Sequence, residues 1–363
     1  MTPSQAAPGQ PTVAFLCMSP KHSSATRRMI DSKGGPFNIV FPDFGIDKVH
    51  RSIAQRLIGL DYLPVLKVVL NPRHDVIWAW GHDVCFIASI GMLFTKRRRL
   101  IWDISDINLQ LLQPTLKSKL LRIIERLLVR RADRLFLTSA GFYDTYYKFI
   151  VEERKVNIIE NKKNEIPEMA TTTPARSAPP WVIVYAGIFR STAMVKLILA
   201  VAKALGHNFR FHLHGCVDRN TDISPLVLPE TAQDNVVYFG SYTSDELPGI
   251  YQAGHIVWGF TDAAANLNER ILLTNRIYDA MAYCRPIITN EDTFSGVTVL
   301  DRTIGVTSKY SVDGIVAALS ALAADDGRKY AELVATMPSI EGAYLLGAYR
   351  NAVADEARRT VPE

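Results

Sequence analysis

The sequence predicts an α/β protein built from two doubly wound parallel-sheet domains that face a central cleft. Its 363 residues are enough for two domains of ordinary size. In both halves, short apolar runs alternate with segments of helical spacing, which is the pattern of a parallel sheet covered by helices. Residues 166–180 are rich in Pro, Thr, Ala and Ser, lack periodicity and separate the two halves. Because ligands of such sheets bind at the carboxyl ends of the strands, we expect the site there.

The apolar runs of the first half are short and bounded by polar residues or Pro, which is typical of buried strands. They lie at residues 11–18, 37–41, 76–80, 100–102 and 134–138. A longer segment, residues 116–131, has apolar residues at helical spacing and predicts an amphipathic helix. The residues that share its apolar face are Leu120, Ile123, Ile124, Leu127 and Leu128.

The second half repeats this alternation. Strands are expected at residues 181–186, 209–213, 236–239, 256–259 and 286–289, and helices at 194–205 and 275–283. The expected organisation is a first domain at 1–167, a linker at 168–180, a second domain at 181–340 and a final helix within 341–363. We expect this final helix to pack back on the first domain.

Composition excludes several classes of protein. Hydrophobic residues make up 48% of the chain and charged residues 21%, which are ordinary globular values. Four Cys without a CxxC pair argue against a disulfide scaffold or a zinc ribbon. The longest apolar run, residues 84–94, is too short to span a bilayer, and the first ten residues lack the features of a signal peptide. We therefore expect a soluble or peripheral protein.

Charge is divided unevenly between the two halves. Residues 1–165 carry 25 Lys and Arg against 15 Asp and Glu, whereas residues 166–363 carry 16 against 21. The basic half predicts contact with an anionic surface, and the basic positions of residues 122–134 next to an apolar face favour a membrane. The run Lys96–Arg99 is either part of that surface or a solvated helix end. Aromatic residues at 142–149 are expected to pack in a helix, because no nucleic-acid-binding motif accompanies them.

The familiar catalytic and phosphate-binding signatures GxxxxGK[ST], HExxH, GxSxG and GxGxxG after a strand are absent. Instead, Gly187, Gly215 and Gly240 each come just after an expected strand of the second half. Glycine at such a place lets the chain turn and lets backbone amides approach a ligand, although turns alone explain many of these residues.

The segment NRIYDAMAYCRPIITN, residues 275–290, resembles the second domain of GT-B glycosyltransferases, in particular those of family 4. The resemblance implies two Rossmann-like domains and a nucleotide-sugar donor, with Asp279 accepting hydrogen bonds from the ribose hydroxyls. Other donor-binding residues that it implies are Gly187, Arg190, Gly215, Gly240, Tyr242, Asn275, Arg276 and Tyr278. The chain departs from the family at Ile271, where a second acid is usual, and at Ile188 and Ala193, where Arg and Lys are usual. Arg190 or Arg276 would then neutralise the diphosphate.

Candidate catalytic residues lie in the first half at expected strand ends. The motif WDISD, residues 102–106, resembles the acceptor-side strand end of the family and supplies Asp103 and Asp106. The motif WGHD, residues 80–83, supplies His82, and His22 is a weaker candidate. In an inverting enzyme one of these would be the general base. In a retaining enzyme, which the family implies, they would position the donor or the acceptor. The alternative is that both aspartates only cap a turn or a helix.

The resulting hypothesis is a hexosyltransferase of surface polysaccharide synthesis that needs a nucleotide sugar and no metal or other cofactor. Its partners would be a polyprenyl-diphosphate-linked saccharide acceptor and the anionic inner face of the cell membrane, without nucleic acid. It would be cytoplasmic and peripherally bound. Two alternatives stay open: a sugar-nucleotide epimerase of the same fold, and a non-catalytic protein that binds nucleic acid or a partner subunit.

Overall fold

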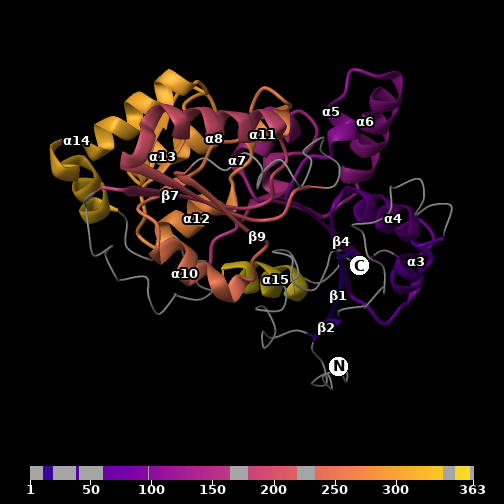
Figure 1. The fold of residues 1–363 in the computed structure, drawn as a ribbon. Helices are drawn as coiled ribbons and strands as arrows, with labels where there is room; N and C mark the ends of the chain where they lie inside the picture. Colours follow the sequence, from indigo (N-terminus) through magenta and orange to yellow (C-terminus); the bar gives the residue numbers. More distant parts are fainter. Residues whose placement is uncertain are drawn as a thin grey trace. The chain divides into compact units, whose positions relative to one another are not determined.

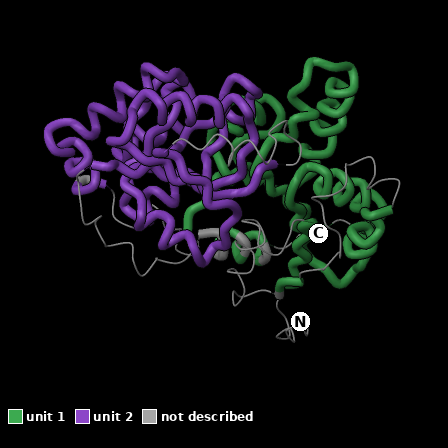
Figure 2. The backbone as a smooth tube through the Cα atoms, in the orientation of Figure 1, with its two compact units in different colours: residues 1–164, 345–363 green, residues 165–344 purple. Residues whose placement is uncertain are grey.

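The computed structural model divides into two compact units, residues 1–164 with 345–363 and residues 165–344 (Figure 2). The residues that it describes are 11–18, 38–40, 60–96, 98–163, 179–218, 234–337 and 348–359. His22 and most of the expected linker lie outside the described residues.

Unit 1 contains a six-stranded sheet in which every ladder is parallel. The strands are β1 (Thr12–Leu16), β2 (Asn38–Val40), β3 (Val76–Trp80), β4 (Arg99–Ile104), β5 (Arg134–Leu137) and β6 (Val156–Ile158), in the spatial order β2-β1-β3-β4-β5-β6. The parallel sheet expected for the first half is therefore confirmed. Its central strands are buried on both faces, which explains their nearly continuous apolar runs.

The helical elements of unit 1 follow its strands (Figure 1). They are α3 (Leu63–Leu70), α4 (His82–Met92), α5 (Leu109–Leu112), α6 (Leu116–Val129), α7 (Ala140–Phe142), the π-helix η2 (Tyr143–Tyr147), the 3₁₀ helix η3 (Glu153–Lys155) and α15 (Ala348–Arg358). Helix α6 begins where the Thr115 side chain accepts a hydrogen bond from the Ser118 N–H at 3.1 Å. Helix α4 packs against β3 and β4, and Ala354 of α15 joins a buried cluster with Phe15 and Trp78.

Unit 2 contains a second parallel sheet, as the sequence predicts, but with six strands rather than the five expected, because β12 was not expected. Its strands are β7 (Trp181–Ala186), β8 (Phe209–His214), β9 (Val236–Gly240), β10 (Ile256–Trp258), β11 (Ile287–Asn290) and β12 (Gly305–Ser308), in the order β12-β11-β10-β7-β8-β9. Alternate residues of β7 pack into different clusters: Ile183 lies with α8 and α14, and Val184 lies with α10 and α12. Both faces of the sheet are thus covered.

The helical elements of unit 2 are α8 (Thr192–Leu205), the 3₁₀ helices η4 (Gly206–Asn208) and η5 (Ser244–Glu246), α10 (Leu247–Gln252), α11 (Leu267–Ile271), α12 (Asn275–Ala282), α13 (Phe294–Asp301) and α14 (Val312–Thr336). Helix α8 begins after Ser191, whose side chain accepts from the Met194 N–H. Helix α14 contains non-helical residues from Ala324 to Gly327, so it consists of two helices joined at a kink.

The strand order of each sheet reverses once, and this reversal locates the expected ligand position. In unit 1 the chain runs outward from β1 to β2 and then returns to β3 on the other side of β1. In unit 2 it runs from β7 to β9 and then returns to β10 on the other side of β7. Ligands of open α/β sheets bind beyond the carboxyl ends of the strands at such a switch point. The expected ligand positions are therefore the carboxyl ends of β1 and β3 in unit 1, and of β7 and β10 in unit 2.

Across the described ranges, no helix has both the length and the apolar character that crossing a membrane requires.

The basic run Lys96–Arg99 is only partly a surface feature. Arg98 donates hydrogen bonds to the carbonyl oxygens of Asn71, at 2.6 Å, and of Val69 at the end of α3. Arg99 is nearly buried in β4 and pairs with Glu356. Neither alternative for the run, an anionic-surface contact or a solvated helix end, holds for these two guanidinium groups, because backbone and carboxylate oxygens inside unit 1 already bind them.

Glu356 ties the last helix to the sheet of unit 1. It is 2% exposed, pairs with Arg99 and accepts from Arg134 Nε at 2.9 Å. Replacing it by Gln leaves the nearly buried Arg99 and the partly buried Arg134 without their carboxylate, which is expected to lower the free energy of unfolding of unit 1 by about 3–5 kcal/mol. Thermal and urea unfolding would measure the loss. Asp355→Asn is the matched control, because it breaks only an exposed pair with Arg358 and should cost less than about 1 kcal/mol. Equal small losses would contradict the structural role of Glu356.

Candidate functional site

Arg276 lies at the switch point of unit 2. Its Nη2 donates to the carbonyl oxygen of Phe260, just beyond β10, at 3.3 Å. Its Cζ lies 4.7 Å from the ring centroid of Tyr185 on β7. A Cβ atom at Gly187 would lie 2.9 Å from Arg276 Nη1, so glycine makes room for this guanidinium. The guanidinium thus sits between the carboxyl ends of β7 and β10, where a cation can meet an anionic ligand.

The three predicted glycines lie together at the ends of β7, β8 and β9. The Gly187 N–H donates to His214 O at 3.0 Å, and the Gly215 N–H donates to Gly240 O at 2.7 Å. Gly215 has a φ of +139°, and a Cβ there would lie 1.7 Å from Gly187 O. Only glycine fits at position 215, because both its backbone conformation and its neighbour exclude a side chain.

Asp279 lies on α12, one turn after Arg276. It is 5% exposed, and its Oδ2 accepts from the Tyr251 hydroxyl at 3.2 Å. Burial and the charge of Asp279 raise the pKa of Tyr242 to about 12, whereas Arg276 opposes that rise. The same tyrosine is therefore within electrostatic reach of both charged side chains. Arg276, Asp279 and Tyr242 form one group, as the sequence predicts for residues of a common site.

The remaining predicted donor residues differ in position. Asn275 is exposed at the first turn of α12, and Arg190 is exposed beyond β7. Burial raises the pKa of Tyr185, and the charges of Arg276 and Arg190 oppose that rise, so Arg190 also lies near this strand end. Tyr278 is 0% exposed and belongs to the core cluster of α12. The structure thus places Tyr278 in the core, and its contact with a donor stays a prediction.

His214 belongs to the same region and was missed by sequence reasoning. Its ring stacks on Phe239 at 4.5 Å with an interplanar angle of 2°, and it meets Tyr242 edge-on at 6.5 Å. Burial and the neighbouring His212 lower the pKa of His214 to about 4, so the imidazole is neutral near pH 7. The only available signal in the sequence was its place directly before Gly215.

In unit 1, His82 lies at the switch point and enters a buried network. It is the first residue of α4, directly after β3 and Gly81, and it is 6% exposed. Its Nε2 lies 3.0 Å from the Tyr147 hydroxyl and 3.2 Å from Glu125 Oε1. Glu125, on α6, is 0% exposed and also accepts from the Tyr147 and Tyr146 hydroxyls.

The network determines which nitrogen of His82 carries the proton. Burial and the charge of Glu125 raise the pKa values of Tyr146 and Tyr147, so both hydroxyls stay protonated and donate to the carboxylate. The Tyr147 oxygen and Glu125 can then only accept from His82 Nε2, which therefore bears hydrogen. In the neutral imidazole, Nδ1 is then the nitrogen that accepts a hydrogen bond. In the sequence, Glu125 stands out as the single acid among the six Lys and Arg of residues 116–131.

The two predicted aspartates occupy different environments. Asp103 is 1% exposed inside β4, before the strand end, and its Oδ2 accepts from the Trp78 indole N–H at 3.1 Å. Its expected place after the strand is wrong, because β4 continues to Ile104. Asp106 is exposed two residues beyond β4. The Gly81 N–H donates to Asp103 O at 2.9 Å, so the ends of β3 and β4 that carry His82 and Asp106 are neighbours.

Among the residues that the structure describes, no three His, Cys, Asp or Glu side chains gather closely enough to hold a metal ion.

Comparison with known proteins gives similarity mainly at the level of the fold. No protein-family model matches the chain. The succinoglycan biosynthesis protein ExoL of Rhizobium meliloti is 25% identical over 243 residues, which span 62% of this chain and 60% of the relative. The chain thus covers less than two thirds of that relative.

Solved structures align over nearly the whole chain. Anabaena HepE in complex with UDP has a TM-score of 0.74 at 14% identity, covering 95% of this chain and 99% of that one. The lipopolysaccharide outer core galactosyltransferase WaaB has a TM-score of 0.64 at 12% identity, covering 95% and 98%. Sucrose-phosphate synthase from Thermosynechococcus elongatus has a TM-score of 0.66 at 12% identity, covering 95% and 100%. With its two parallel six-stranded sheets, this chain has the GT-B fold of two Rossmann-like domains.

Proposed function

We propose that this protein is a glycosyltransferase that takes a hexose from a nucleotide sugar and adds it to a growing surface glycan. The observation that carries the proposal is the group at the switch point of unit 2. There an arginine guanidinium, a nearly buried carboxylate and three glycine turns surround the ends of adjacent parallel strands. An arginine suits a diphosphate, and a carboxylate suits a ribose diol. Similarity to a succinoglycan biosynthesis protein and to a fold seen with UDP supports the same conclusion.

The residues of unit 2 would share the work of binding the donor. Arg276, with Arg190, would bind the diphosphate and stabilise the charge that develops as it leaves. Asp279 would accept from the ribose hydroxyls, and the backbone at Gly187 and Gly215 would let the pyrophosphate approach closely. His214, neutral and stacked on an aromatic ring, offers a flat surface for the base. No metal is part of this scheme, since Arg276 supplies the positive charge.

Unit 1 would supply the acceptor side. His82, held through Nε2 by Tyr147 and Glu125, would use Nδ1 to accept a hydrogen bond or a proton from a sugar hydroxyl. Asp106, exposed at the neighbouring strand end, would align the acceptor. The acceptor would be a saccharide linked to a polyprenyl diphosphate at the inner face of the cell membrane, where the basic first half would meet anionic lipid.

The test is a calorimetric titration of the protein with UDP-, GDP- and ADP-hexoses, followed by incubation with the bound donor. Binding of one nucleotide sugar, and transfer of its labelled sugar to a lipid-extractable acceptor from membranes, is the expected result. Interconversion of the donor without acceptor would instead identify an epimerase. Absence of binding to every nucleotide sugar, by a protein with its normal melting temperature, would contradict the proposal.

A further inference from the structure

Helix α6 presents an apolar stripe to solvent. Leu116, Leu120, Ile123 and Leu127 are exposed by 82%, 59%, 55% and 61%. They are spaced four, three and four residues apart, so they form one continuous row along the helix. The sequence identified the apolar face of this segment correctly, but three of its five expected members point away from the core of unit 1. An exposed row of this kind marks an interaction surface.

The exposed charges of the helical segment itself all have one sign. Residues 116–131 contain six basic side chains: Lys117, Lys119, Arg122, Arg126, Arg130 and Arg131. The single acid, Glu125, is completely buried on the opposite face of the helix, where it binds Tyr146 and Tyr147. At 100° per residue, Lys119 and Arg126 flank one side of the stripe, and Lys117 and Arg131 flank the other. A helix with an apolar row between basic flanks is suited to lie in the interface of an anionic bilayer.

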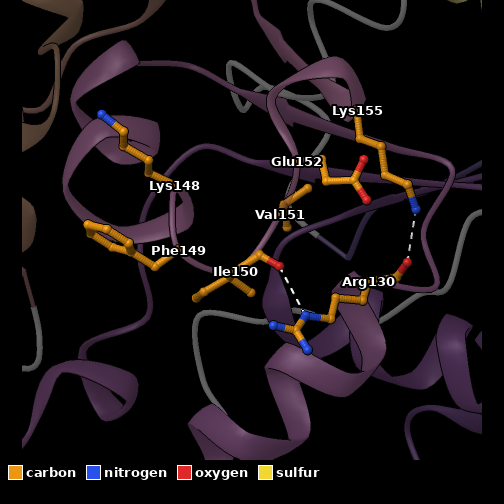
Figure 3. Close-up of a pocket in the computed structure, with 7 residues that line it drawn as sticks. All are labelled: Arg130, Lys148, Phe149, Ile150, Val151, Glu152 and Lys155. Carbon is orange, nitrogen blue, oxygen red and sulfur yellow. Dashed lines mark hydrogen bonds between the residues drawn. The ribbon is translucent and has the colours of Figure 1, made fainter.

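A cavity of about 390 Å³ lies at the carboxyl end of the same helix. Arg130 lines it, and Arg130 continues the exposed row three residues after Leu127. Figure 3 shows Arg130 and Lys155 on one side of this cavity and Lys148 and Phe149 on the other.

Two basic side chains that line this cavity, Arg130 and Lys148, can bind an anion. The geometry of Arg130 is the better defined of the two. Arg130 donates through Nε to Ile150 O at 3.2 Å, which orients the guanidinium and leaves its Nη nitrogens for another acceptor. Lys155 is committed to the backbone, because its Nζ donates to the carbonyl oxygens of Arg130 and Ala132. The lining acid, Glu152, pairs with Arg154 outside the cavity. The charge that the cavity offers a ligand is therefore positive, and a planar guanidinium matches a phosphate.

We propose that α6 docks this protein on anionic phospholipid, with the stripe at the boundary of the acyl chains and the cavity at Arg130 receiving the phosphate of one lipid headgroup. This inference rests on the membrane association included in the proposed function, and it names the helix, the cavity and the lipid chemistry. The stripe supplies apolar area and the cavity supplies selection for anionic headgroups. Neither involves the donor residues of unit 2.

The test is sedimentation with vesicles of phosphatidylcholine alone and of phosphatidylcholine containing phosphatidylglycerol. The unmodified protein should bind the anionic vesicles preferentially, and binding should weaken as salt shortens the screening length to about 8 Å at physiological ionic strength. The double variant Leu120→Gln/Leu127→Gln should lose at least about tenfold in binding. Leu300→Gln removes a similarly exposed leucine from α13 and should leave vesicle binding unchanged. Equal binding to both vesicles, or no loss in the double variant, would overturn the docking of α6.

A second pair of variants tests the cavity. Arg130→Gln should weaken binding to the anionic vesicles by more than about fivefold, which is the scale for one basic residue at a membrane surface. Arg131→Gln removes the same charge from an exposed neighbour that does not line the cavity, and it should weaken vesicle binding less than Arg130→Gln does. Equal losses would overturn the headgroup site. Calorimetric titration with the nucleotide sugar separates the two proposals. Donor binding without vesicle binding would reject only the docking surface. Vesicle binding without binding of any nucleotide sugar would reject the enzymatic function and leave the docking surface in place.

Discussion

Replacing His82 by alanine is expected to lower the rate of sugar transfer by about 10²–10⁴-fold, which is the scale for loss of a positioned acid–base group. His82 lies at the switch point of unit 1, and its buried network leaves Nδ1 as the reactive nitrogen. Affinity for the nucleotide should change little, because the proposed donor residues belong to unit 2. Steady-state kinetics and calorimetry of the same preparation measure both quantities. Unchanged turnover in a folded variant would remove His82 from the mechanism.

A matched pair of tyrosine variants isolates the positioning role of the network. Tyr147→Phe removes a hydroxyl that contacts both His82 and Glu125, whereas Tyr146→Phe removes one that contacts only Glu125. Both keep the ring and both delete one hydrogen bond to the same carboxylate, but Tyr147→Phe also deletes the contact with His82, so its melting temperature should fall further. Turnover should fall more for Tyr147→Phe. Equal turnover in the two variants would mean that the network only stabilises the fold.

The two aspartates of the neighbouring strand should respond differently from each other. Asp106→Asn changes an exposed side chain at the strand end and is expected to lower turnover with little effect on melting temperature. Asp103→Asn changes a buried carboxylate that accepts from the Trp78 indole, so it should lower the melting temperature instead. The reverse pattern would exchange the functional and structural roles assigned to them.

Replacing Arg276 by glutamine is expected to weaken nucleotide-sugar binding by about 1.5–3 kcal/mol, or about 10- to 150-fold. The reason is the loss of a guanidinium that stands between the ends of β7 and β10, where a diphosphate would meet it. The loss should be smaller for a nucleoside monophosphate, which has fewer charged oxygens to bind. Arg270→Gln on the exposed surface of α11 is the control and should leave the affinity unchanged. Equal affinities for Arg276→Gln and the control would reject the assigned diphosphate site.

Asp279→Ala should weaken binding of the nucleotide sugar by a similar amount. The contact with the ribose can be tested separately with a modified nucleotide sugar. Removing the 2′-hydroxyl from the nucleotide sugar should weaken binding to the unmodified protein but should cost nothing further in Asp279→Ala. Additive losses would show that Asp279 does not bind this hydroxyl. Because Asp279 also accepts from Tyr251, its variant needs a melting curve beside the titration.

Much of the candidate site was predictable because its residues belong to patterns that are visible within short segments of the sequence. Gly187, Gly215 and Gly240 follow apolar runs, so their place at strand ends can be read without a structure, and the structure brings them together through backbone hydrogen bonds. Arg276 and Asp279 are three residues apart in a helical segment, which puts them on one face. Glu125, Tyr147 and His214 were not predictable in the same way. Glu125 and Tyr147 come from separate elements and reach His82 only when α6 and η2 pack beside the start of α4.

By itself, the sequence determined five of the six strands of each sheet, the parallel α/β class and the apolar face of α6, because all of these follow from residue spacing along short segments. The edge strands β6 and β12 were not expected. Only the tertiary structure decided where those faces point. Helical periodicity shows that α6 has two different faces. The packing of Glu125 against Tyr146, Tyr147 and His82 turns the apolar stripe toward solvent. Likewise, Arg98 and Arg99 belong to a basic run in the sequence, yet carbonyl groups and Glu356 that are distant along the chain bind them inside unit 1. A local pattern reports what a segment can bury, whereas contacts between distant segments determine what it does bury.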